Sequence, residues 1–136
     1  MSDKRTVLIV MPVTIEFPTF RENLKAVLEA EGFNVRTTVY AESACTLIKD
    51  IKPDAVVTAL DLPMNNVSED ASVEAGGKIL NSIYKLPDYE QPKVIVIDAA
   101  LCPPTDDGTQ VVDTFLDLKS STPYDVLEVL QQAFRT

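Results

Sequence analysis

The chain has 136 residues, a formal net charge of -9, no histidine and two cysteines. This length suits one ordinary domain, which buries roughly two thirds of its unfolded surface without disulfides or metals, so we expect a single domain over residues 1–136. The acidic balance, with no basic run longer than the N-terminal "DKR", argues against nucleic acid as a partner.

The cysteines and the N-terminus indicate the compartment. Cys45 and Cys102 form no CxxC motif and have no histidine to complete a zinc site, so two free thiols in a reducing cytosol are expected. The apolar run near the N-terminus is far shorter than the ~20 residues that span a bilayer, and no small-residue cleavage site follows it. We therefore expect a cytoplasmic protein with no membrane partner.

The first strand and helix follow directly. Residues 6–11, "TVLIVM", are a continuous apolar run that is typical of a central parallel strand covered on both faces. Residues 19–31 carry apolar side chains at helical spacing, with Pro18 at the entrance and Gly32 as the stop. A strand followed by a helix is therefore predicted.

The next elements repeat this order. Residues 33–39 alternate in the manner of an outer strand, and residues 41–52 predict a helix that Pro53 ends. Residues 54–63, "DAVVTALDLP", read as a third, buried strand that ends near the carboxylate of Asp61.

The middle of the chain contains a polar interruption. Residues 64–75 are polar, acidic and without periodicity, which predicts a loop. Residues 76–86 restore the apolar stripe of a helix, and residues 93–98, "KVIVID", predict the fourth strand.

The C-terminal part supplies the last elements. Prolines and glycine after the fourth strand allow only a short, weak fourth helix, which we place at residues 108–114. Residues 115–119, "FLDLK", predict the fifth strand. Thr122, Pro123 and Asp125 then supply the cap, first-turn proline and third-position acid of a last, fifth helix.

Five strands that alternate with helices predict a doubly wound α/β fold, a three-layer arrangement with a parallel sheet in the middle. Ligands of such sheets bind at the carboxyl ends of the strands. Asp61, Asp98 and Lys119 each lie at the predicted end of a strand. We therefore expect any functional site at that edge.

Over nearly its full length the sequence resembles a response-regulator receiver domain. The resemblance implies a flavodoxin-like fold with strand order 2-1-3-4-5. It rests on the order and spacing of the following segments: "VLIV" near the start, "LEAEGFNV" at 28–35, "KPDAVVTALDLP" at 52–63, "LPDYEQPKVIVIDA" at 86–99 and the strand that ends at Lys119.

Receivers hold magnesium with an acidic pair after the first strand and accept a phosphoryl group on an aspartate that ends the third. Here the acidic pair is replaced by Met11 and Pro12, and the phosphoacceptor position falls on Ala59. A carboxylate must share a cation with the phosphoryl group it attacks, because otherwise charge repulsion opposes the reaction. The resemblance therefore implies a receiver without magnesium or any other cofactor.

Two further family positions are occupied by Asp98, where receivers carry Thr or Ser, and by Lys119, which matches the family lysine. Ser120 replaces the proline that usually follows, so no cis peptide is expected there. The nearby acid Asp61 is two residues beyond Ala59, which displaces it by ~6.6 Å along a strand. Lys119 is expected either to form an ion pair with the acids Asp61 and Asp98 or simply to cap its strand and reach solvent.

These departures favour a non-phosphorylatable pseudo-receiver, not an enzyme, that binds a protein partner in signal transduction, through the fourth helix, fifth strand and fifth helix or as a homodimer. Three alternatives stay open. Asp61 could be a recruited phosphoacceptor in an atypical receiver of a two-component system. The chain could bind a nucleotide or flavin, although residues 11–20 contain no glycine for a phosphate loop. It could also be an assembly domain like the receiver-like wings of some pyridoxal-phosphate decarboxylases.

Overall fold

The computed structural model describes residues 5–11, 18–59, 62–65, 71–98, 111–117 and 120–134, with the side chains of 18, 71–74 and 98 left out. Five parallel strands form the central sheet in the order β2-β1-β3-β6-β7, which confirms the predicted order 2-1-3-4-5. Their bounds are β1 Thr6–Val10, β2 Asn34–Thr38, β3 Ala55–Thr58, β6 Lys93–Asp98 and β7 Thr114–Asp117.

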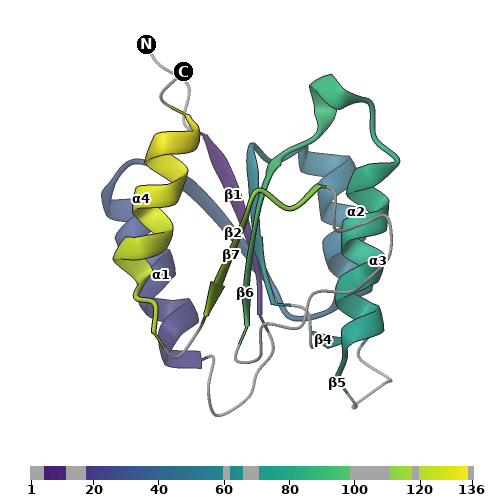
Figure 1. Cartoon of the computed structure of the whole chain (residues 1–136), viewed down its shortest axis with the longest axis horizontal. Helices are drawn as coiled ribbons and strands as arrows, with labels where there is room; N and C mark the ends of the chain where they lie inside the picture. Colours follow the sequence, from purple (N-terminus) through teal and green to yellow (C-terminus); the bar gives the residue numbers. More distant parts are fainter. Residues whose placement is uncertain are drawn as a thin grey trace.

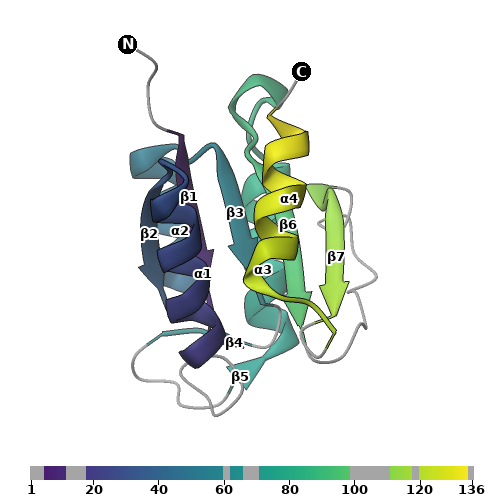
Figure 2. The same ribbon diagram turned by 90° about the vertical axis from the view of Figure 1, so that its left-hand side faces the viewer.

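Two layers of helices cover the sheet. The helices α1 (Pro18–Ala30) and α4 (Pro123–Ala133) pack together on one face, and α2 (Ala41–Ile51) and α3 (Val73–Tyr84) pack together on the other, as Figure 1 and Figure 2 show. Because both faces are covered, the central strands β1 and β3 are buried apart from Thr6 and apolar apart from Thr6 and Thr58. The predicted three-layer α/β architecture is confirmed.

The predicted helix ends are also confirmed. Gly32 follows α1 with φ +94°, a conformation that side-chain-bearing residues rarely adopt. Thr122 caps α4 in a capping box with Asp125, and Pro123 occupies the first turn. The C-cap of α2, Lys52, takes a left-handed conformation (φ 47°) next to Pro53.

The third strand and the loop after it differ from the prediction. The predicted strand over 54–63 ends at Thr58, so Asp61 does not close it. Leu62–Pro63 instead forms a separate short strand, β4, that pairs antiparallel with β5, Ala71–Ser72, inside the segment predicted as a loop. Two-residue strands are held by pairing rather than by side-chain alternation, so no sequence period marks them.

Two helices need correction. The helix predicted from residue 76 begins three residues earlier, at Val73, because "VEA" before the glycines extends it. In the helix predicted over 108–114, Val112 and Asp113 are not helical and Thr114 begins β7. Asp113 donates its backbone N–H to the carbonyl of Val94, which already aligns it with the sheet. Residues 108–110 lie outside the described part.

Candidate functional site at the carboxyl edge of the sheet

The carboxyl ends of β1 and β3 lie side by side. Val10 and Thr58 are partners in the parallel register, so Met11 and Ala59 are the next residues of neighbouring strands. The backbone N–H of Ala59 donates to Val10 O over 2.9 Å, and that of Met11 donates to Thr38 O over 3.3 Å. Both side chains have 0% exposed surface. These positions therefore continue the core to the end of the sheet.

Neither side chain suits phosphoryl chemistry. Magnesium is held by oxygen ligands, and Met11 and Ala59 offer a thioether and a methyl group. The buried hydroxyl of Thr58 is the nearest side-chain oxygen along β3, and it donates to the carbonyl of Ala59 over 2.7 Å. At the ends of β1 and β3 the described chain thus presents packed apolar groups.

Asp117, an acid that sequence reasoning missed, ends β7, which lies two strands away from β3 in the sheet. Asp98, the last residue of β6, is the register partner of Asp117, the last residue of β7. Asp117 is half-buried and already has an interaction partner. The signal was present in "FLDLK", where alternation places Asp117 on the same face as Lys119. The sequence pattern therefore predicts that Asp98, Asp117 and Lys119 lie together at the ends of β6 and β7.

The other predicted site positions cannot be placed. Pro12, Asp61 and Lys119 lie outside the described residues, as does the side chain of Asp98. The ion pair expected between Lys119 and an acid accordingly stays a prediction. So does the trans peptide expected at Ser120.

The segment after this edge is anchored to α2. Leu62 of β4 is fully buried, and the carbonyl of Met64 accepts the backbone N–H of Glu42 over 2.9 Å. The Nδ2 atom of Asn65 donates to Glu42 Oε2 over 2.7 Å. The start of the region that the sequence predicts as a loop is therefore fixed to the first turn of a helix.

The described residues contain neither a cluster of metal ligands nor a membrane-spanning helix. Within the described ranges, no three His, Cys, Asp or Glu side chains gather closely enough to hold a metal ion. Cys45 is a free, buried thiol that accepts a hydrogen bond from Ser82 Oγ over 3.3 Å, and Cys102 lies outside the described residues. None of the helices in the described part is long and apolar enough to cross a bilayer.

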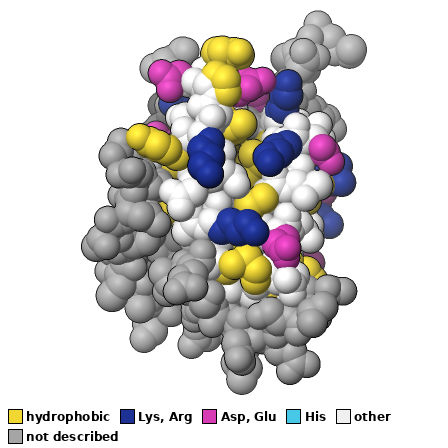
Figure 3. All heavy atoms as spheres, turned by 90° about the vertical axis from the view of Figure 1, so that its right-hand side faces the viewer, with side chains coloured by type: hydrophobic (Ala, Val, Ile, Leu, Met, Phe, Trp, Pro, Cys, Tyr) yellow, Lys and Arg dark blue, Asp and Glu magenta, His cyan; other side chains and the backbone are white. Residues whose placement is uncertain are grey.

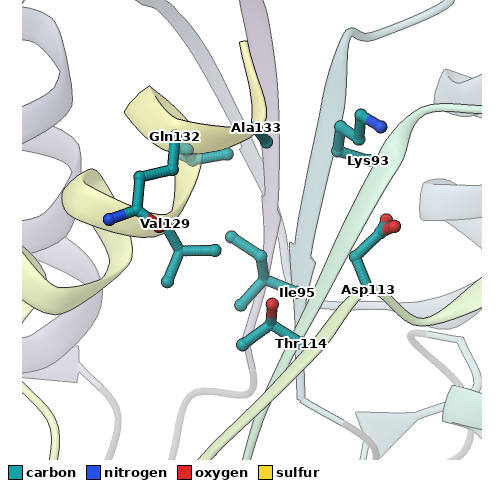
Figure 4. A pocket seen from close by; sticks show the side chains of 8 residues that line it. Lys93, Ile95, Asp113, Thr114, Val129, Gln132 and Ala133 are labelled. Carbon is teal, nitrogen blue, oxygen red and sulfur yellow. The ribbon is translucent and has the colours of Figure 1, made fainter. Parts of the chain in front are cut away.

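A groove lies on the flank formed by β6, β7 and α4. Its volume is about 300 Å³. In Figure 4, Val129 of α4 faces Ile95 and Thr114 of the neighbouring strands, which form the floor of the groove. Lys93, Asp113 and Gln132 supply polar groups around it. This groove belongs to the fifth-strand and last-helix surface that the sequence analysis favours for partner binding.

Exposed aromatic side chains lie on the same two elements. Phe115 of β7 is 37% exposed, and Tyr124 in the first turn of α4 is 68% exposed. Aromatic groups of this kind are enriched among the residues that dominate binding energy at protein interfaces.

The sequence matches no family model and no curated protein. Solved structures of the same fold are numerous. A CheY-like receiver domain from Methanospirillum hungatei superimposes with a TM-score of 0.74 and 19% identity, covering 96% of this chain and 94% of that one. The chemotaxis response regulator CheY4 of Vibrio cholerae gives a TM-score of 0.72 and 15% identity, covering 97% and 100%.

A third neighbour carries the metal that this edge would hold in a receiver. It is the receiver domain of a sensor histidine kinase from Pseudomonas aeruginosa, with magnesium coordinated in its active-site cleft. It shares 18% identity with a TM-score of 0.71, covering 96% of this chain and 97% of that domain. At such identities the likeness shows the fold, which is that of CheY-like receivers.

Proposed function

We propose that this receiver-fold chain is a pseudo-receiver, a cytoplasmic and non-enzymatic signalling module that does not accept a phosphoryl group and works by binding a protein. One observation carries the proposal, namely the fully buried Met11 and Ala59 at the ends of neighbouring strands. A receiver needs oxygen ligands and a carboxylate nucleophile at this place. The apolar side chains of Met11 and Ala59 support a module that has neither the metal ligands nor the nucleophile.

The proposed contact surface is the β7–α4 flank. It includes the groove lined by Ile95, Thr114 and Val129. Its elements also carry two exposed rings, that of Phe115 on the other face of β7 from Thr114 and that of Tyr124 in the first turn of α4. A groove of mixed apolar and polar lining, on a strand and a helix that also carry exposed aromatic rings, matches the composition of protein interfaces. The partner is therefore a protein that covers this flank. In a homodimer, that protein is a second copy of the chain.

A pull-down from native lysate with matched baits tests the proposal. Val129→Glu places a charge in the groove and should abolish capture of the specific partner, because a buried unpaired carboxylate opposes binding. Gln131→Glu adds the same charge to the same helix outside the groove and should leave capture intact. Recovery of a small metabolite in place of a protein, or equal capture by both variants, would contradict the proposal.

A further inference from the structure

The outer surface of α2 and α3 carries a cluster of lysines, although the whole chain has a net charge of -9. Lys49 of α2 and Lys78 and Lys85 at α3 and its C-terminal end are all exposed. Figure 3, which views this layer from outside, shows dark blue side chains over the middle of the face, with magenta ones beside them and toward the upper margin. We call Lys49, Lys78 and Lys85 the lysine cluster.

Contacts between the two helices place these lysines near one another. Cys45 Sγ lies 3.9 Å from the carbonyl of Lys78 and 3.3 Å from Ser82 Oγ, so these residues face each other across the seam. Lys49 follows Cys45 by one helical turn and Lys85 follows Ser82 by about one turn, each a rise of about 5.4 Å. The cluster therefore borders one stretch of the seam between the helices.

The lysine cluster has no internal compensation. None of its three ammonium groups makes an ion pair with another described residue, whereas Lys52 pairs with Glu90 over 3.2 Å. Of the exposed acids on α2, Glu42 lies one turn before Cys45 and accepts a hydrogen bond from Asn65, and Asp50 is turned by about 100° from Lys49. Like charges held together on a surface repel one another unless an anionic partner neutralises them.

We propose that the lysine cluster is a second interface, on the helical layer opposite to α4, that binds an acidic segment of a partner protein. This goes beyond the β7–α4 contact, because the two surfaces lie on opposite sides of the sheet (Figure 1) and can be occupied together. Opposite charges on the acidic segment and the lysine cluster would give specificity and a faster association rate more than a higher affinity.

Other anionic occupants fit less well. Nucleic acid binding relies on neutralising many phosphates, which three cations on a chain of charge -9 do not provide. An anionic membrane surface attracts clusters of four to eight basic residues. A short run of Asp and Glu in a protein matches a cluster of this size.

Titration with a short, capped oligoglutamate peptide at low salt, followed by amide chemical shifts, tests this interface. We expect saturable shifts confined to α2 and α3 and loss of binding at high salt, because exposed charges are screened. Replacing the cluster by glutamine (Lys49→Gln, Lys78→Gln and Lys85→Gln) should weaken binding on the order of tenfold. The matched triple variant Arg21→Gln, Lys25→Gln and Arg36→Gln should bind like the wild type.

In the titration, any of four results would overturn the proposal: no binding at low salt, shifts centred on other elements, equal weakening by the two triple variants, or tighter binding of duplex DNA or anionic vesicles than of the peptide. Sedimentation of the free protein tests whether a second copy of this chain occupies the lysine cluster. Self-association that the lysine-cluster variant abolishes would identify a second copy of the chain and reject the acidic partner.

Discussion

Met11 and Ala59 lie at the carboxyl ends of neighbouring strands, β1 and β3. Each follows a strand that is buried on both faces, and each has no exposed surface. A carboxylate at either position would lose its hydration, and the described residues around it offer no cation to compensate. The two residues therefore act as core residues in this chain.

Substituting Ala59→Asp should destabilise the fold by about 3 kcal/mol, because an unpaired carboxylate would enter an apolar, fully buried position. Urea unfolding measures the change. Ser43→Asp is the matched control, since it adds the same acid at an exposed position in the first turn of α2, and it should change the stability by less than about 0.5 kcal/mol. Unchanged stability of the Ala59 variant would mean that this position is open to water and suited to an acid.

At this scale the sequence predicts some of the site. The order of strands places Met11 and Ala59 at the carboxyl edge, because their neighbours are unmistakable apolar runs. Their full burial depends on tertiary packing and is not visible in the sequence. Asp117 was overlooked because the family pattern directs attention to Lys119, whereas the register of β6 and β7 reveals its alignment with Asp98.

Among the elements, α4 shows how local sequence fixes a boundary. The hydroxyl of Thr122 accepts the backbone N–H of Asp125 over 3.4 Å, and Asp125 Oδ2 accepts the backbone N–H of Thr122 over 2.7 Å. Both bonds satisfy donors that the first helical turn would otherwise leave open. The buried residues Val126, Leu127 and Leu130 then attach the helix to the sheet.

Thr122→Ala should lower the free energy of unfolding by about 1 kcal/mol, because it removes the cap while leaving the buried face of α4 unchanged. Chemical denaturation of this variant and of Ser121→Ala, whose hydroxyl is outside the capping box, provides the comparison. A double-mutant cycle with Asp125→Ala should reveal coupling, since the two side chains form one box. Additive losses from the two substitutions would argue that the reciprocal bonds do not act together.

Elements with strong periodicity or caps were predictable, and elements held by pairing were not. The strand over 93–98 was placed at its observed bounds, since a β-branched run between Pro92 and the polar residues beyond it is unambiguous. The strand predicted over 54–63 is too long, because Leu62 and Pro63 are apolar but pair with Ala71–Ser72 outside the main sheet. No local pattern distinguishes these two uses of apolar residues.

For the whole molecule, the alternation of strands and helices sufficed to predict the doubly wound fold, because right-handed crossovers leave few other arrangements. The fold leaves three separate surfaces: the carboxyl edge, the β7–α4 flank and the α2–α3 layer. Sequence alone could not show which side chains remain exposed on them, since exposure depends on how the layers pack. We propose that partner binding takes place on the two flanks and that the edge has no phosphoryl chemistry.

Amide spectra recorded with magnesium and beryllofluoride, together with intact mass after incubation with acetyl phosphate and magnesium, test this account most directly. We predict no shifts at Met11 or Ala59 and no gain of a phosphoryl group, because these positions supply neither a metal ligand nor a nucleophile. Saturable shifts at the carboxyl edge with a stoichiometric aspartyl phosphate, which Asp61→Asn removes, would show a working atypical receiver and contradict the account.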